Sequence, residues 1–169
     1  MWSAYGGINS ITIHPNGEYR VRPLPISQEF INEFHNSMVL FYTGQQRKSF
    51  EIAKSHDNIA AEKHKHNIHK IAEEALVAFA NEDINEIGRL LDKNWHQKKS
   101  TSPLISTSEI DDLYLETKKW GCLGFKLLGS GQSGFILCIT NDRKRLLNNI
   151  PLQNIDFSFD FEGSKIILS

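Results

Sequence analysis

The densest glycine cluster in the sequence has residue types suited to binding a phosphate group. The cluster consists of Gly129, Ser130, Gly131, Gln132, Ser133 and Gly134. Glycine reaches backbone dihedrals that other residues avoid, so successive amide hydrogens of such a loop can converge on an anion. The two serine hydroxyls can donate further hydrogen bonds to phosphate oxygens, and Lys126 adds a positive charge just upstream. The predicted chemistry is phosphate binding.

The residues that follow the cluster exclude several well-known nucleotide-binding loops. The spacing satisfies GxGxxG, but the apolar run from Phe135 to Ile139 predicts a buried strand where a dinucleotide-binding fold would begin a helix. No Lys-Ser or Lys-Thr pair follows the glycines, and no VAIK, HRD or DFG segment of a protein kinase occurs. Two interpretations remain, a phosphate loop between two strands and a mobile hairpin turn.

Three other cations are candidate phosphate ligands. Arg47 follows a predicted strand end, and a guanidinium group matches phosphate geometry with two parallel hydrogen bonds. Lys98 and Lys99 close a predicted helix. Each has an ordinary alternative, because Arg47 could be a surface residue and the lysines could simply offset the helix dipole.

A group of histidines could form a metal site, but the positive charges of neighbouring lysines disfavour metal binding. The histidines are His56, His64, His66 and His69. Lys63, Lys65 and Lys70 lie among them and repel a cation, so a solvated helix face is the favoured interpretation. No nucleophilic triad or pair of carboxylates stands out, and the sequence predicts no catalytic residue and no metal.

The surrounding pattern predicts strands at both ends of the chain and helices between them. Residues 7–13 and 19–24 alternate around Pro15-Asn16-Gly17, which indicates a β-hairpin. The expected elements that follow are a short helix capped by Ser27, a strand at 38–42, helices at 58–79 and 84–95, a helix with a Ser106–Glu109 capping box that stops at Gly121, strands at 125–128 and 135–140, a helix at 143–149, and strands at 155–161 and 165–168. This order predicts an α+β fold in which the termini build an antiparallel sheet of about four strands and helices cover one side.

Composition is that of an ordinary globular domain. The chain has 169 residues, of which 40% are hydrophobic and 23% charged, and a net charge of −1. We therefore expect one domain over residues 1–169, with no attraction to nucleic acid. No run is long enough to span a membrane, and Cys122 and Cys138 sit in apolar contexts without CxxC spacing, which favours reduced core thiols and a cytoplasmic location.

The segment Gly-Phe-Lys-Leu-Leu-Gly-Ser-Gly-Gln-Ser-Gly-Phe, from Gly124 to Phe135, resembles the C-terminal glycine motif of the GHMP kinases, the superfamily of galactokinase, homoserine kinase and mevalonate kinase. Further segments agree in order with the branch that includes D-glycero-D-manno-heptose 7-phosphate kinases. They are Tyr5-Gly6-Gly7-Ile8-Asn9, Phe41-Tyr42-Thr43-Gly44 with Arg47, Leu90-Leu91 with Trp95, Lys98 and Lys99, and Phe161-Glu162-Gly163-Ser164. The loop departs from the usual Gly-Ala-Gly-Gly-Gly-Gly pattern at Ser130, Gln132 and Ser133.

The resemblance implies the C-terminal domain of a sugar kinase that uses ATP and Mg²⁺ on a heptose phosphate or related sugar phosphate. It also implies an N-terminal partner domain with an ATP loop of the type Pro-x-x-x-Gly-Leu-Gly-Ser-Ser, a string that this sequence lacks. The family's catalytic aspartate precedes Tyr-Gly-Gly by more residues than lie before Tyr5. We therefore expect no activity and no tight ATP binding from this chain alone. The alternative is a free-standing binding or interaction domain without catalysis, and an exposed apolar patch would allow a homodimer.

Overall fold

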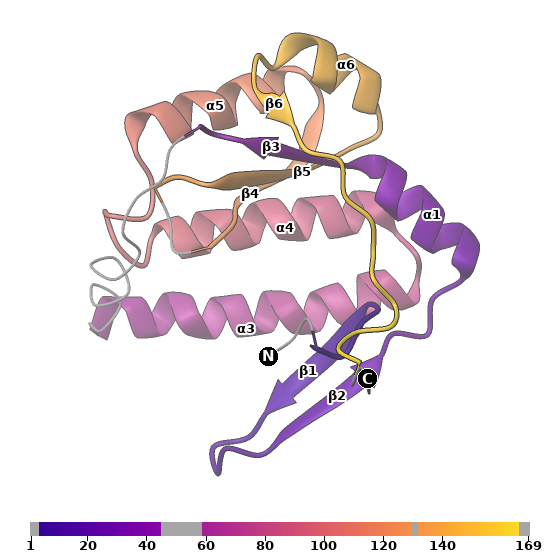
Figure 1. Cartoon of the computed structure of the whole chain (residues 1–169). Helices are drawn as coiled ribbons and strands as arrows, with labels where there is room; N and C mark the ends of the chain where they lie inside the picture. The colour runs from indigo at the N-terminus through magenta and orange to yellow at the C-terminus, as the bar shows by residue number, and fades with distance from the viewer. Residues whose placement is uncertain (1–3, 45–58, 130–131, 166–169) are drawn as a thin grey trace.

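A two-stranded hairpin opens the described part of the protein. The structure is a computed structural model that describes residues 4–44, 59–129 and 132–165 (Figure 1). Strands β1 (Asn9–Ile13) and β2 (Tyr19–Pro23) pair antiparallel, and Gly17 makes the turn between them with a φ of +86°. The predicted hairpin is confirmed. It forms a sheet of its own, so the expectation that the N-terminal strands join the main sheet is wrong.

The main sheet contains four antiparallel strands. These are β3 (Met38–Tyr42), β4 (Cys122–Leu127), β5 (Phe135–Thr140) and β6 (Gln153–Asn154), in the order β4-β5-β3-β6. The central pair β3 and β5 consists almost entirely of apolar residues, because both faces of these strands are covered. The predicted α+β class and the four-stranded antiparallel sheet are confirmed.

Side chains alternate between the two faces of this sheet and separate the core into two clusters. Phe125, Ile136 and Val39 point to a cluster completed by α5 (Ser108–Lys119) and α6 (Arg143–Asn149). Met38 and Ile139 point to the opposite cluster, which α1 (Gln28–Ser37), α3 (Ile59–Ala80) and α4 (Ile84–Lys99) complete. Figure 1 shows α3 and α4 on the expected covered side, with α5 and α6 covering the other side in addition.

Helix α4 contacts the edge strand β4 at an unusually short distance. A Cβ atom added to Gly124 would lie 2.9 Å from the Cα of Gly88, and one added to Gly88 would lie 2.9 Å from the Cβ of Leu123. Gly124 cannot hold a larger side chain without a shift of the Gly88 backbone, and Gly88 can hold one only if Leu123 moves. This pair of glycines therefore fixes the distance between α4 and the strand that leads into the glycine cluster.

The helices begin at the N-cap residues that the sequence predicts, except at α5. The side chains of Ser27 and Asp83 accept hydrogen bonds from the first turns of α1 and α4, as N-caps do. In α5 the N-cap is Thr107, whereas the sequence predicted Ser106 with Glu109. The Ser106 hydroxyl instead donates a 2.7 Å hydrogen bond to Asp111, one turn into the helix. The N-cap thus lies one residue later than predicted, and Ile110 at the third helical position rules out a capping box.

The C-terminal segment does not form the strand predicted over residues 155–161. Strand β6 ends at Asn154, and residues 155–165 form no strand. The second predicted strand, at 165–168, lies almost wholly outside the described part of the chain. Phe157 and Phe159 of this segment pack against His35 and Phe34 of α1. Side-chain packing on α1 and isolated backbone hydrogen bonds, such as that from the Ile155 amide to the Leu40 carbonyl, therefore hold the segment where a continuous ladder was expected. None of the described helices could span a bilayer.

Candidate phosphate-binding loop

The glycine cluster connects β4 to β5, as the sequence predicted. The amide of Leu128 donates to the carbonyl oxygen of Phe135 at 2.8 Å and closes the base of the loop. Gly129 and Gly134 have φ values of +76° and +112°, and Gln132 has a φ of +62°, which is uncommon for a residue other than glycine. Ser130 and Gly131 lie outside the described residues. Beyond the β4–β5 ladder, the loop backbone therefore adopts left-handed conformations, which favour glycine.

Two segments distant in sequence anchor the second half of the loop. The amide of Gly134 donates to the hydroxyl of Thr43, at the end of β3, over 2.9 Å, and the Thr43 amide donates back to the Gly134 carbonyl at the same distance. The amide of Gln132 donates to the carbonyl of Ile105 at 2.8 Å. Within the described part of the chain, the amides of Gly129 and Ser133 have no such partner. They are the described loop amides available to an anion.

Lys98 anchors the first half of the loop from the C-terminal end of α4. Its Nζ lies 2.6 Å from the carbonyl oxygen of Gly129 and 3.1 Å from that of Leu127. Burial, together with repulsion from Lys126, lowers the pKa of Lys98 to about 8. The sequence named Lys98 as a phosphate ligand or a helix-dipole partner. Contact with the loop backbone is a third role, which spacing alone does not indicate.

Lys126 lies on the sheet face covered by α3 and α4. It pairs with Leu137 in the β4–β5 ladder, and both residues line a cavity below the sheet. Burial lowers the pKa of Lys126. Leu127, its neighbour in sequence, points to the opposite cluster. The side chain of Lys126 thus lies on the α3 and α4 side of β4, the strand that leads into the loop.

The remaining predicted cations occupy different settings. Lys99 donates to the Asp111 carboxylate at 2.6 Å, which ties the end of α4 to the first turn of α5. Burial raises the pKa of Asp111, but the hydrogen bonds from Lys99 and Ser106 outweigh it and leave that pKa lowered. Arg47 lies outside the described residues. The phosphate roles of both cations stay predictions.

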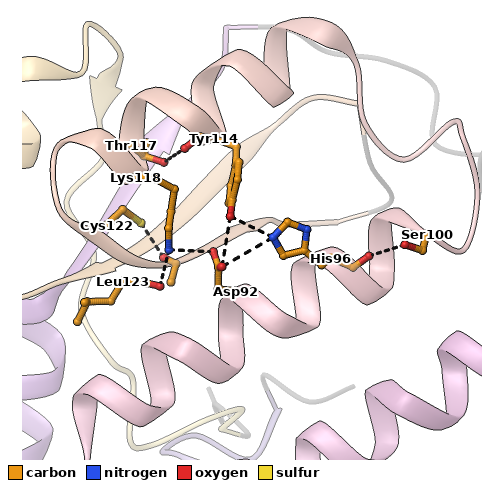
Figure 2. Close-up of polar contacts among 9 residues, drawn as sticks. Asp92, His96, Ser100, Tyr114, Thr117, Lys118, Cys122 and Leu123 are labelled. Atoms are coloured by element: carbon orange, nitrogen blue, oxygen red, sulfur yellow. Dashed lines mark hydrogen bonds and ion pairs between the residues drawn. The ribbon is translucent and has the colours of Figure 1, made fainter.

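A polar network joins α4, α5 and the start of β4 (Figure 2). Asp92 of α4 lies 3.4 Å from the Lys118 ammonium and accepts a 3.3 Å hydrogen bond from the Tyr114 hydroxyl. His96 lies 3.0 Å from the same hydroxyl, and Lys118 also donates to the Leu123 carbonyl at 2.9 Å. Burial, and then the charge of Asp92, raise the pKa of Tyr114 to about 12. The network orients the helix whose end carries Lys98.

The first and last described segments cross each other at closely packed glycines. The Gly7 amide donates to the carbonyl of Asp160 at 2.6 Å, and the Ser164 amide donates to the carbonyl of Ala4 at 3.0 Å. A Cβ atom added to Gly6 would lie 2.6 Å from the Gly163 nitrogen. A cavity of about 400 Å³ lies beside this crossing. The sequence singled out both segments, but nothing in their spacing predicts that they meet.

The histidines of α3 form no metal cluster with other described residues. The Nδ1 of His64 lies 2.9 Å from the side-chain oxygen of Gln97 on α4, and His69 lies 3.7 Å from Glu73 in the same helix. His56 falls outside the described residues. Cys122 and Cys138 are buried and free of disulfides, as predicted, and the Cys122 thiol donates to the Gly124 carbonyl at 2.9 Å.

Comparison with known proteins finds a family match for the part of the chain that contains the loop. Residues 75–153, which run from α3 to β6 and include the glycine cluster, match the family described as GHMP kinases C terminal. The chain is 26% identical over 172 residues to the D-glycero-alpha-D-manno-heptose 7-phosphate kinase of Campylobacter jejuni, a match that covers 96% of this chain and 51% of that protein. The chain thus spans about half the length of this relative.

Solved structures agree on the fold. Mevalonate kinase from L. major superposes with a TM-score of 0.73 at 17% identity, over 96% of this chain and 51% of that one. A D-glycero-D-manno-heptose 1-phosphate kinase from Bacteroides thetaiotaomicron superposes with a TM-score of 0.67 at 22% identity, over 98% and 47%. Residues 75–153 thus match a GHMP kinase C-terminal domain, as the sequence indicated, and one curated relative is a heptose phosphate kinase.

Proposed function

We propose that this chain forms the C-terminal half of an ATP-dependent sugar kinase that acts on a heptose phosphate or a related sugar phosphate. The observation that carries the proposal is the loop between β4 and β5, which three distant residues, Thr43, Lys98 and Ile105, hold in place. The similarity to a heptose phosphate kinase over almost the whole chain supports it. An N-terminal domain would supply the nucleotide loop and the catalytic aspartate.

In this proposal the chain contributes positioning and electrostatic stabilisation. Phosphoryl transfer is catalysed mainly by these two effects, so a loop with preset amides can lower the barrier without doing covalent chemistry. The amides of Gly129 and Ser133, with the hydroxyl of Ser133, would donate to phosphate oxygens. Mg²⁺ and ATP, when bound, would supply the transferred group and neutralise part of its charge. Lys98 would hold the loop in the receptive conformation.

The alternative function is a binding or interaction domain that keeps the fold without catalysis. One structural observation favours it, because the amides of Gln132 and Gly134 already donate to protein oxygens. A family loop of glycine and alanine has no side chains at the positions of Gln132 and Ser133 that could crowd a phosphate.

Complementation of kinase activity tests the proposal. The N-terminal half of the Campylobacter relative would be produced separately, mixed with this chain, and assayed with ATP, Mg²⁺ and D-glycero-α-D-manno-heptose 7-phosphate. A fusion of the two halves in one polypeptide guards against weak association. We expect turnover in the mixture or the fusion and none with either half alone.

A Ser133→Leu variant provides the loop control. The leucine removes a hydroxyl donor and fills space at the loop, so the variant should lose turnover while keeping the thermal unfolding midpoint of the parent chain. Absence of turnover in both the mixture and the fusion, with both halves folded, would favour the non-catalytic alternative. Analytical ultracentrifugation of this chain alone tests the further prediction of a homodimer.

A further inference from the structure

A cavity of about 210 Å³ lies between α3, α4 and the lower face of the sheet. Aliphatic and aromatic side chains make most of its wall, among them Phe34, Ile71, Leu90 and Ile139. Protein interiors are normally packed without voids much larger than a water molecule. A cavity of this size therefore offers many van der Waals contacts to a bound molecule of the right shape.

The cavity has one polar end. Among the described residues that line it, only Lys126 and Asn94 carry polar side chains. Within the described part of the chain, no hydrogen bond or ion pair reaches the Lys126 ammonium, and burial lowers its pKa. Lys126 lies close enough to Lys98 that, after burial, its charge is the second cause of the lowered pKa of Lys98. The polar end thus presents positive charge to the interior of the cavity, and none of the described residues that line it carries a carboxylate.

We propose that this cavity is a binding site for a small amphipathic anion, a molecule with a compact apolar body and one carboxylate group. The carboxylate would pair with the Lys126 ammonium and accept from the Asn94 amide, and the apolar body would fill the space between α3 and α4. An apolar cavity of about 150 Å³ stays dry and can hold a benzene ring. The cavity below the sheet therefore has room for a ring or for an alkyl chain on the order of six to ten carbons.

This site is distinct from the phosphate contacts proposed for the loop. Lys126 lies on the face opposite Phe125 and Leu127, and the apolar wall excludes a sugar phosphate, whose hydroxyl groups would lose their hydrogen bonds there. The strand that carries Lys126 nevertheless leads directly into the loop. A ligand in the cavity would bind whether or not the chain supports phosphoryl transfer. A negative binding assay therefore contradicts only this proposal, and a negative kinase assay contradicts only the proposed function.

Isothermal titration of the chain with octanoate and with 1-octanol tests the proposal. Both probes have the same apolar chain, and only octanoate carries a charge. We expect saturable binding of octanoate to the unchanged chain. Lys126→Met keeps the length of the side chain without its charge, and it should weaken octanoate about tenfold while octanol changes less than about twofold. Ala75→Phe, which fills the cavity from α3, should abolish binding of both probes.

Lys144→Met is the matched control, because Lys144 is exposed on α6 and far from the cavity wall. It should bind both probes as the parent does. Methyl NMR spectra of the unchanged chain keep the test valid if a variant misfolds, since octanoate should shift the methyl signals of Ile71, Leu90 and Ile139. The proposal is overturned if octanoate does not bind at millimolar concentration, if Lys126→Met binds it equally well, or if the shifted signals lie elsewhere.

Discussion

The Nζ of Lys98 lies 2.6 Å from the carbonyl oxygen of Gly129, so the last turn of α4 holds the first glycine of the loop. The same nitrogen reaches the carbonyl of Leu127 at the end of β4. A cation that meets two carbonyl dipoles is stabilised, but it is also partly removed from water and stands near the cation of Lys126. The balance lowers the pKa of Lys98 to about 8 and makes the stability of the loop depend on pH.

We predict that the chain becomes more stable between about pH 8 and pH 10 in a way that requires Lys98. The pKa of Lys98 is about 8 in the folded chain, against 10.5 for an ordinary lysine. Between these values the unfolded chain binds more protons, so the free energy of unfolding rises with pH. Relative to Lys98→Met, it should rise by about 1–2 kcal/mol, a figure reduced for the screening of a partly exposed group.

Guanidinium denaturation of both chains at several pH values from 7 to about 10 measures this difference. Lys126, whose pKa is also lowered, is present in both chains and largely cancels. A difference between the two chains that stays constant across this range would contradict the assignment of a depressed pKa to Lys98.

Thr43 should control the second half of the loop. Its hydroxyl accepts the hydrogen bond of the Gly134 amide, and Thr43→Val keeps the shape while removing the acceptor. We expect the Gly134 amide to exchange with solvent about tenfold faster and the chain to lose about 1 kcal/mol of stability. Hydrogen exchange followed by NMR measures the first effect. Thr12→Val on the exposed hairpin should leave Gly134 unchanged, and an equal effect of the two variants would refute a specific role for Thr43.

The contact between Gly88 and Gly124 should be intolerant of a single added methyl group. In Gly124→Ala the new Cβ would meet the backbone of Gly88, which cannot move without shifting α4. We expect a loss of about 2–4 kcal/mol in the free energy of unfolding. Gly88→Ala should cost less, because its Cβ meets the side chain of Leu123. Thermal or chemical denaturation ranks the two variants, and the reverse order would show that the short approach is misassigned.

Most elements of this fold could be predicted from local signals in the sequence. Ser27 and Asp83 precede amphipathic runs and cap α1 and α4 as expected, since capping depends on residues only three positions apart. The strands around the glycine cluster were visible as apolar runs. The prediction of a strand at 155–161 was wrong because Phe157 and Phe159 alternate as in a strand, whereas their rings pack on a helix and not in a sheet.

The candidate site was predictable in position but not in its contacts. The glycine cluster was identified from composition, yet its anchors at Thr43, Lys98 and Ile105 lie 27 to 91 residues away, and no periodicity reports such distances. The side of the sheet to which Lys126 points likewise depends on the β4–β5 register. These relationships arise from tertiary packing, which a single sequence encodes only indirectly.

Tyr114 should titrate far above an ordinary tyrosine, and Asp92 should be one of the reasons. Burial, the Asp92 charge and the hydrogen bond to Asp92 raise the pKa of Tyr114 to about 12. Asp92→Asn keeps the size and one acceptor oxygen but removes the charge, so this pKa should fall toward the ordinary value of about 10 without reaching it, since burial persists. The ultraviolet absorbance of tyrosinate, taken as the difference from a Tyr114→Phe chain, follows the group. Asp112→Asn, an exposed change on the same helix as Tyr114, should leave the titration in place. If Asp92→Asn also leaves it in place, the network in Figure 2 does not couple α4 to α5 electrostatically.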